Sequence, residues 1–199
     1  SDSPLDELRE QSTISSQACA AASLTEGPSS IDVYSVESES SIGELLARLD
    51  EYSDMIGDSD AASALRRFRY TLGGLPVPVS LHDTWVQNQL DKGNPWVPRR
   101  LRSRRNEIER LAEEAVIDAE LLDMALTTVD TLLNSLSGRN PLGETLLDIL
   151  DRAASQELSV GVICTKKTYK EMLDIFFRDQ ASDWALGDNL MLLDEDTVR

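Results

Sequence analysis

Apolar residues recur at steps of three and four between residues 42 and 154, and this periodicity constrains the fold more than any other feature of the chain. Residues three and four apart share one face of a helix, so the pattern predicts amphipathic helices packed around a common core. Glycine and proline interrupt it at Gly73–Val79 (GGLPVPV) and again between Gly93 and Pro98. A regular helix cannot continue through these breaks, which therefore separate neighbouring helices.

Five helical segments follow from the pattern and its breaks. Ser40 or Ser41 is the expected N-cap of the first helix, and Gly57 ends it. The helical spacing places one apolar face of this helix inward, formed by Ile42, Leu45, Leu46, Leu49, Tyr52, Met55 and Ile56, and predicts that Leu65 and Phe68 face inward from the second helix. The longest pattern is either one helix of about 35 residues or two helices joined near Asp118. Asn140, which a proline follows, is placed to begin the last helix. The expected helices cover residues 42–56, 60–72, 81–91, 100–136 and 142–154.

The C-terminal part of the chain has a different character. Residues 158–164 (LSVGVIC) form an apolar run rich in β-branched residues, which is typical of a strand buried on both faces. A helix is expected over residues 168–178, and Leu190–Leu193 (LMLL) is a second short strand. Helix, strand, helix and strand in this order predict an α/β layer with parallel strands. Such a sheet needs more strands, so either Ile31–Val36 (IDVYSV) joins it or it continues in sequence outside this chain.

The predicted fold class is therefore mainly α with a small α/β unit. Residues 1–41 are rich in serine and are expected to be weakly structured, with one strand. A helical domain over residues 42–155 then leads into a small α/β unit over residues 156–199, which is truncated if its sheet continues elsewhere. Neither end resembles a natural terminus, so we expect the chain to be part of a longer protein.

The chain carries a formal net charge of −17, with 36 acidic and 19 basic residues. Only 4 of the basic residues are lysines against 15 arginines, and aspartate (20) outnumbers glutamate (16). Few lysines and many short carboxylates are typical of a high-salt cytoplasm, where salt screens the mutual repulsion of the carboxylates. We therefore expect a cytoplasmic protein of halophilic, haloarchaeal type, an ordinary acidic protein being the alternative. No apolar run approaches the roughly 18 residues of a membrane span, so no membrane partner is expected.

Single residues with special chemistry are few. Cys19 and Cys164 are far apart, which disfavours a disulfide framework or a cysteine-ligated zinc site and predicts two reduced, buried thiols. His82 is the only histidine, which excludes histidine-rich metal sites and any Ser-His-Asp triad without it. No catalytic residue, metal ligand or cofactor site is predicted. Trp85 and Trp96 lie in or beside the second break, where tryptophans usually pin a loop to the core, ligand stacking being the alternative.

Two stretches approach nucleotide-binding motifs without completing them. Gly138–Thr145 (GRNPLGET) matches the P-loop G-x-x-x-x-G-K-[ST] except that Glu144 replaces the lysine that neutralises phosphate. A predicted helix rather than a strand precedes it, so a turn between two helices is the better interpretation. Asp194–Asp196 (DED) begins like the magnesium-binding D-E-x-D box, but Thr197 replaces its last carboxylate. An acidic strand end is the expected role of that stretch.

Six arginines within twelve residues stand out against the negative charge of the chain. Arginine forms bidentate contacts with phosphate, so these residues are candidate nucleic-acid contacts. Two alternatives remain open: the arginines pair with carboxylates of the same protein, such as those of Glu107 and Glu109, or they bind a protein partner. Arg66, Arg67 and Arg69 extend the cluster if the two helices pack together. The candidate residues are Arg99, Arg100, Arg102, Arg104, Arg105 and Arg110.

The segment Val160–Phe177 (VGVICTKKTYKEMLDIFF), with the helix from Glu144 to Ala154 before it, resembles the opening of the second RecA-like domain of superfamily 2 helicases. In that family a leucine-bearing helix precedes a strand, a short Cys-Thr or Asn-Thr turn and a further helix, and Cys164–Lys167 (CTKK) occupies the turn here. The resemblance covers residues 144–193 and implies a helical insertion or accessory domain over residues 1–140, ahead of a truncated motor domain. The arginine-finger motif of the family is absent from the chain, so ATPase activity is not implied.

These observations predict a non-catalytic helical accessory or interaction module of a larger assembly that handles nucleic acid. One alternative is a fragment of a helicase-like NTPase whose active site is completed by sequence outside this chain. The other is a free-standing acidic adaptor, whose charged surface serves solubility alone.

Overall fold

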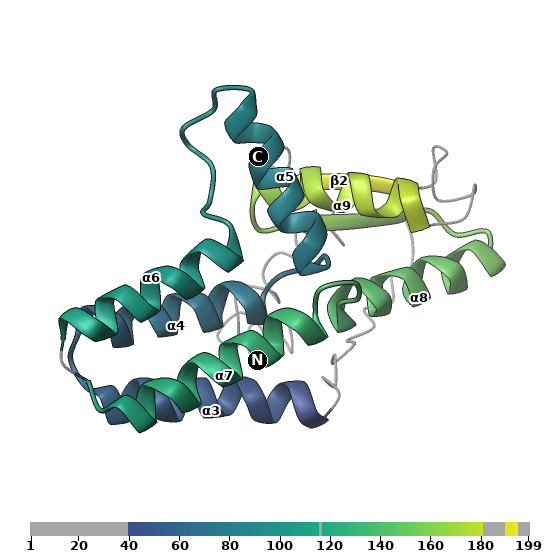
Figure 1. Ribbon diagram of the computed structural model, residues 1–199. Helices are drawn as coiled ribbons and strands as arrows, with labels where there is room; N and C mark the ends of the chain where they lie inside the picture. Colours follow the sequence, from purple (N-terminus) through teal and green to yellow (C-terminus); the bar gives the residue numbers. More distant parts are fainter. Residues whose placement is uncertain (1–39, 116, 181–189, 195–199) are drawn as a thin grey trace, which may run out of the picture.

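The computed structural model describes residues 40–115, 117–180 and 190–194. In these residues the protein forms seven helices and two strands, which confirms a mainly α fold with a small α/β unit at its C-terminal end (Figure 1). The serine-rich segment, the predicted strand Ile31–Val36 and Cys19 lie outside the described residues. The elements are α3 (Ser40–Ile56), α4 (Asp60–Gly73), α5 (Val79–Asp91), α6 (Leu101–Glu114), α7 (Ala119–Ser135), α8 (Pro141–Ser155), β1 (Val160–Cys164), α9 (Lys167–Gln180) and β2 (Leu190–Asp194).

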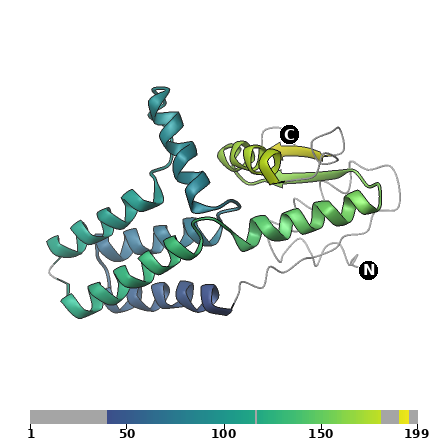
Figure 2. The same ribbon diagram turned by 45° about the vertical axis from the view of Figure 1, so that its right-hand side comes forward.

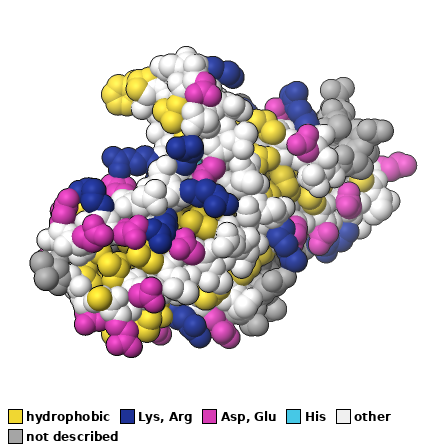
Figure 3. All heavy atoms as spheres, viewed as in Figure 1, with side chains coloured by type: hydrophobic (Ala, Val, Ile, Leu, Met, Phe, Trp, Pro, Cys, Tyr) yellow, Lys and Arg dark blue, Asp and Glu magenta, His cyan; other side chains and the backbone are white. Residues whose placement is uncertain are grey.

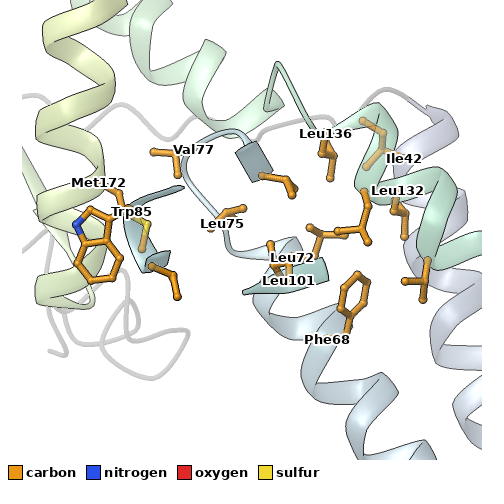
Figure 4. Packing of buried hydrophobic residues seen from close by; sticks show 14 of the residues in the cluster. Ile42, Phe68, Leu72, Leu75, Val77, Trp85, Leu101, Leu132, Leu136 and Met172 are labelled. Carbon is orange, nitrogen blue, oxygen red and sulfur yellow. The ribbon is translucent and has the colours of Figure 1, made fainter. Parts of the chain in front are cut away.

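Helices α3, α4, α6 and α7 pack side by side into one group, as Figures 1 and 2 both show. Their apolar faces meet in a core that contains the fully buried side chains of Leu49, Leu65 and Phe68. Figure 4 shows Phe68 in this core together with Leu72, Leu101 and Leu132. Leu65 and Phe68 therefore face inward, as the spacing predicts.

One side chain of α3 departs from the predicted apolar face. Met55 was expected inward, but its side chain is exposed, and Ser53 is buried instead. A helix turns 100° per residue, so Met55 points about 120° away from the buried Leu49, whereas Ser53 points only about 40° away. Burial of the Ser53 hydroxyl is balanced by two hydrogen bonds, because it donates to the carbonyl of Asp50 (2.7 Å) and accepts from Arg66 Nε (3.2 Å).

The long helical pattern of residues 100–136 forms two helices, and Asp118 separates them as one of the two predictions has it. Its carboxylate accepts hydrogen bonds from the backbone N–H groups of Glu120 and Leu121, each at 3.0 Å, and so caps the start of α7. The two helices pack against each other in the four-helix group. The N-cap aspartate is therefore the local signal that ends one pattern and begins the next.

The first proline-rich break runs through the core rather than over the surface. Leu75 and Val77 are buried, and the chain then enters α5, where Val79 N donates to the carbonyl of Leu136 (2.9 Å). Trp85 of α5 is only 6 % exposed and lies in the same buried cluster beside Met172, which confirms the prediction for that residue (Figure 4). The break thus joins the four-helix group to the rest of the molecule.

The far end of α5 and the loop that follows it project from the body of the protein (Figures 1 and 2). We call residues 88–98 the arm. Trp96, in the loop of the arm, is 91 % exposed, so the prediction that it pins the loop to the core is wrong. The loop stands away from the four-helix group, and the indole therefore has no core within its reach.

The C-terminal unit is a pair of parallel strands joined through α9, as predicted. Val160 pairs with Leu190 at one end of the ladder and Cys164 with Asp194 at the other. The prediction that the first strand is buried on both faces is wrong, since Gly161 is exposed and its partner Met191 is 59 % exposed. Among the described elements α9 is the one that packs on both strands, and a single covering helix buries a single face of the sheet.

Candidate nucleic-acid interface

The six candidate arginines lie at the start of α6 and along it, and α6 packs against α4. This packing brings only one of the three α4 arginines to the cluster. Arg66 pairs with Asp54 of α3 (3.2 Å) and Arg69 pairs with Asp50 of the same helix (2.9 Å), so both are directed to α3. Arg67 joins the α6 arginines, because it lines a pocket with Arg99 and Arg104.

Two of the six candidates, Arg105 and Arg110, are already paired with carboxylates of the protein. Arg105 pairs with Asp130 of α7, with Nε and Oδ1 3.2 Å apart, and also with Glu109 one turn along its own helix. The hydrogen bond to Asp130 raises the pKa of Arg105, so this guanidinium is bound firmly between α6 and α7. Arg110 pairs with Glu114 in the last turn of α6 (2.5 Å).

A pocket of about 270 Å³ lies between α4 and α6 and gathers positive charge. Arg67, Arg99 and Arg104 line it together with a single carboxylate, that of Glu107, so its charged lining sums to +2. Arg99 Nη1 contacts Glu107 Oε1 at 2.5 Å. This hydrogen bond, followed by the charges of Arg99, Arg67 and Arg104, lowers the pKa of Glu107. The carboxylate therefore stays ionised and still neutralises only one of the three guanidinium groups.

Arg104 is the least satisfied of these groups. Its Nη1 donates to Thr71 Oγ1 of α4 (3.1 Å), but its buried Nε has no hydrogen-bond partner in the part of the chain that the structure describes. Burial lowers the pKa of Arg104, and the nearby charges of Arg99 and Arg67 lower it further against the opposing effect of Glu107. A buried donor without a partner costs about 1–3 kcal/mol. Arg104 lines the pocket with Arg67 and Arg99, and an acceptor with several oxygen atoms, such as a phosphate, suits guanidinium groups gathered in this way.

A second hollow, of about 560 Å³, lies between α5 and α6 on the other side of the first turn of α6. Arg100 and Arg102 line it, and neither forms an ion pair with any described residue. Figure 3 shows Lys and Arg side chains gathered where the arm meets the start of α6, with hydrophobic side chains at the tip of the arm. Arg99 faces the first hollow and its neighbour Arg100 the second, so the two sites are adjacent.

The backbone N–H groups at the start of α6 are already bound. Asp83 of α5 accepts from Leu101 N through Oδ1 (2.7 Å) and from Arg102 N through Oδ2 (3.3 Å). His82 Nδ1 donates to the same Oδ1 (2.9 Å). The N-cap residue, Arg100, makes no capping hydrogen bond of its own. Any anion at this end of α6 would therefore be held by the guanidinium groups and not by the helix N-terminus.

The order of charges along α6 opposes the helix dipole. The first turn holds no acidic residue and the last turn no basic one, although a helix N-terminus favours negative charge and its C-terminus positive charge. Each charge at the wrong end costs about 0.3–1 kcal/mol when exposed. Arg100 and Arg102 are exposed and without ion pairs among the described residues, so local stability does not explain them. We call Arg67, Arg99, Arg100, Arg102 and Arg104 the arginine face.

Replacing Arg100 with serine is expected to stabilise the protein by about 0.3–1 kcal/mol, because a positive charge leaves the helix N-terminus. Urea unfolding at constant KCl, followed by circular dichroism, measures the change. A structural role for Arg100 would instead make Arg100→Ser less stable than the wild-type protein, and that result would contradict the assignment of this residue to the arginine face.

The near-motifs have structural roles, as predicted for the first of them. Asn140 caps α8 by accepting from Leu142 N (3.0 Å) and Gly143 N (3.3 Å), so GRNPLGET is a turn between two helices. Glu144 pairs with Arg139 (Nε–Oε1 3.4 Å). Asp194 is buried and pairs with Lys170 (3.3 Å), while the next two acidic residues lie outside the described part of the chain.

The other side chains with special chemistry form no candidate site within the described residues. Cys164 is a free, buried thiol, and burial raises its pKa to about 11, which leaves little reactive thiolate at neutral pH. Within the described ranges no group of three or more metal-ligating side chains comes together. No helix in those ranges is long and apolar enough to cross a membrane.

The prediction that Arg66, Arg67 and Arg69 extend the cluster is confirmed for Arg67 alone, because the other two arginines pair with α3. Reading the sequence did not find Asp83, because it caps a helix that begins 18 residues further along the chain. Comparison with protein-family models, with curated proteins and with solved structures finds no match to the chain. The geometry of the arginines is therefore the evidence for the candidate interface.

Proposed function

We propose that this chain is a non-catalytic interaction module that binds nucleic acid through phosphate contacts of the arginine face. The observation that carries the proposal is the pocket between α4 and α6, where three arginines and one glutamate give a charged lining that sums to +2. The surrounding protein is strongly acidic, with a net charge of −17, so a local excess of arginine is contrary to the trend of the whole chain. A polyanion is the ligand class that this excess favours.

Two adjacent hollows support an extended anion over a single one. A lone phosphate or carboxylate would occupy the pocket of Arg67, Arg99 and Arg104 and leave the second hollow empty, where Arg100 and Arg102 outweigh the single carboxylate of Asp83. A nucleic-acid backbone presents phosphates in series, and successive phosphates could engage both hollows across the first turn of α6. Arginine suits this role because its planar guanidinium contacts two phosphate oxygens at once.

The test is the affinity for labelled DNA strands, measured by fluorescence anisotropy from about 0.2 M to 1 M KCl. The variant is Arg100→Gln/Arg102→Gln/Arg104→Gln. We expect roughly tenfold weaker binding, and a slope of log affinity against log salt that is shallower by about two, since each contact with a single strand contributes about 0.7.

The matched control is Arg48→Gln/Arg110→Gln/Arg178→Gln, which removes three charges from exposed arginines outside the arginine face. It should bind within about twofold of wild type, because non-contacting charges act only through the screened field of the whole protein. Equal losses in the two triple variants would assign the binding to bulk charge. No binding by the wild-type protein at any salt concentration would reject the proposal and favour an acidic adaptor.

A further inference from the structure

We infer that the nucleic acid bound by the arginine face is single-stranded, with an unpaired base stacked on the indole of Trp96. The inference rests on the proposed function and adds the class of nucleic acid. It begins from a contrast between two tryptophans, since Trp85 is 6 % exposed and Trp96 is 91 % exposed. An indole buries a large apolar area when a partner covers it, so an exposed indole on a projecting loop is a candidate contact surface.

The loop of the arm holds Trp96 in a defined position. Trp96 N donates to Asn94 Oδ1 (3.1 Å), and Asn94 N donates in turn to the carbonyl of Gln89 at the end of α5 (3.0 Å). Gly93 has a φ of 78°, a left-handed conformation that favours glycine and turns the chain out of the helix. Pro95 and Pro98 fix φ on both sides of the tryptophan. Little backbone entropy is then lost in this loop when a planar ligand stacks on the indole.

The indole lies within reach of the phosphate-binding arginines. Trp96 precedes Arg99 and Arg100 by three and four residues, and an extended chain covers at most about 3.6 Å per residue. The Cα atoms of Trp96 and Arg100 are therefore no more than about 14 Å apart, so one short stretch of nucleic acid can contact both side chains. Arginine for the backbone and an exposed aromatic ring for the bases is the combination that single-strand-binding proteins use.

Stacking on Trp96 requires an unpaired base. In a duplex the faces of the bases are covered by their neighbours, and an indole reaches them only after unstacking. The groove beside the arm also offers the amides of Asn88 and Asn106 next to Arg100 and Arg102. Amides donate and accept hydrogen bonds, and a single strand exposes the base edges that can use them. Asp83 in the same hollow contributes one negative charge, and Arg100 and Arg102 outweigh it, so the charged lining still sums to +1.

The experiment compares a short oligo(dT) strand with a duplex of the same length, by fluorescence anisotropy, for wild type, Trp96→Ala, Trp96→Phe and Leu90→Ala. Trp96→Ala should weaken oligo(dT) binding roughly tenfold and leave duplex binding within about twofold of wild type. Trp96→Phe should keep most of the affinity. Leu90→Ala removes another exposed apolar side chain at the end of α5 and should change neither. Oligo(dT) should also quench the fluorescence of the wild-type protein more than that of Trp96→Ala.

The outcomes separate this inference from the proposed function. If the arginine triple variant binds both ligands more weakly and Trp96→Ala binds oligo(dT) as wild type does, the arginine face stands and the stacking inference fails. Equal losses on strand and duplex in Trp96→Ala would also overturn it, as would a matching loss in Leu90→Ala, which would indicate a general apolar contact. If the wild-type protein binds neither ligand, both proposals fail together.

Discussion

Replacing Gly143 with alanine will destabilise the protein by roughly 2 kcal/mol, a large effect for the addition of one methyl group. Gly143 lies buried in the first turn of α8, where the helix meets both the segment before α5 and the face of α9. A Cβ there would lie 2.8 Å from the carbonyl oxygen of Pro76 and 3.1 Å from Cε1 of Phe176. The oxygen belongs to the backbone and cannot rotate away, so the whole contact between α8 and its neighbours must shift.

Gly138 provides the control, five residues earlier in the same near-motif. A Cβ at Gly138 meets nothing within 4 Å, and Gly138→Ala should therefore change the free energy of unfolding by no more than about 0.5 kcal/mol. Urea unfolding of the two variants in the same concentration of KCl makes the comparison. Equal stability of Gly143→Ala and Gly138→Ala would show that the contacts around α8 yield easily, and would contradict the prediction.

The two glycines also show how far reading the sequence can go. Their spacing resembles a P-loop, and the carboxylate of Glu144 correctly argues for a helix–helix turn instead. Nothing local indicates that Gly143 is needed for close approach, because the atoms it would meet belong to residues 76 and 176. The positions of the helices follow from local periodicity and caps, and the sequence predicted them well. Contacts between segments that lie far apart in the chain have no local signal, and the sequence did not predict them.

The candidate interface also has a part that the sequence predicts and a part that it does not. The concentration of arginine at residues 99–110 is visible in the sequence, but its separation into bound and unsatisfied groups is not. Arg105 forms an ion pair because α7 places Asp130 beside it. Arg104 forms none with the described residues, because the neighbouring turn of α4 offers it the hydroxyl of Thr71 instead of a carboxylate. Which arginine is available is therefore decided by helix packing, on which the spacing of charges along one helix gives no information.

Replacing Asp83 with asparagine should cost about 3 kcal/mol of stability. The Asp83 side chain is 12 % exposed and accepts three hydrogen bonds, from His82 Nδ1 and from the backbone N–H groups of Leu101 and Arg102. Asparagine keeps the shape but has one acceptor oxygen and no charge, and its amide hydrogens face groups that are themselves donors. Asp91→Asn, at an exposed position on the same helix, is the control and should change stability by at most about 0.5 kcal/mol.

The pH dependence of the stability difference between wild type and Asp83→Asn tests whether the charge of Asp83 causes it. Burial alone would raise the pKa of Asp83, but the hydrogen bonds from His82, Leu101 and Arg102 outweigh it and hold the pKa below its usual value. An aspartate with a lowered folded-state pKa stabilises the fold at any pH above its unfolded-state value of about 3.9, and loses this contribution as the pH falls through the folded-state pKa. The stability gap between wild type and Asp83→Asn should therefore narrow as the pH falls below about 4. Urea unfolding across this range in constant KCl measures the gap. A gap that stays constant below about pH 4 would mean that the second acceptor oxygen of Asp83, and not its negative charge, holds the start of α6.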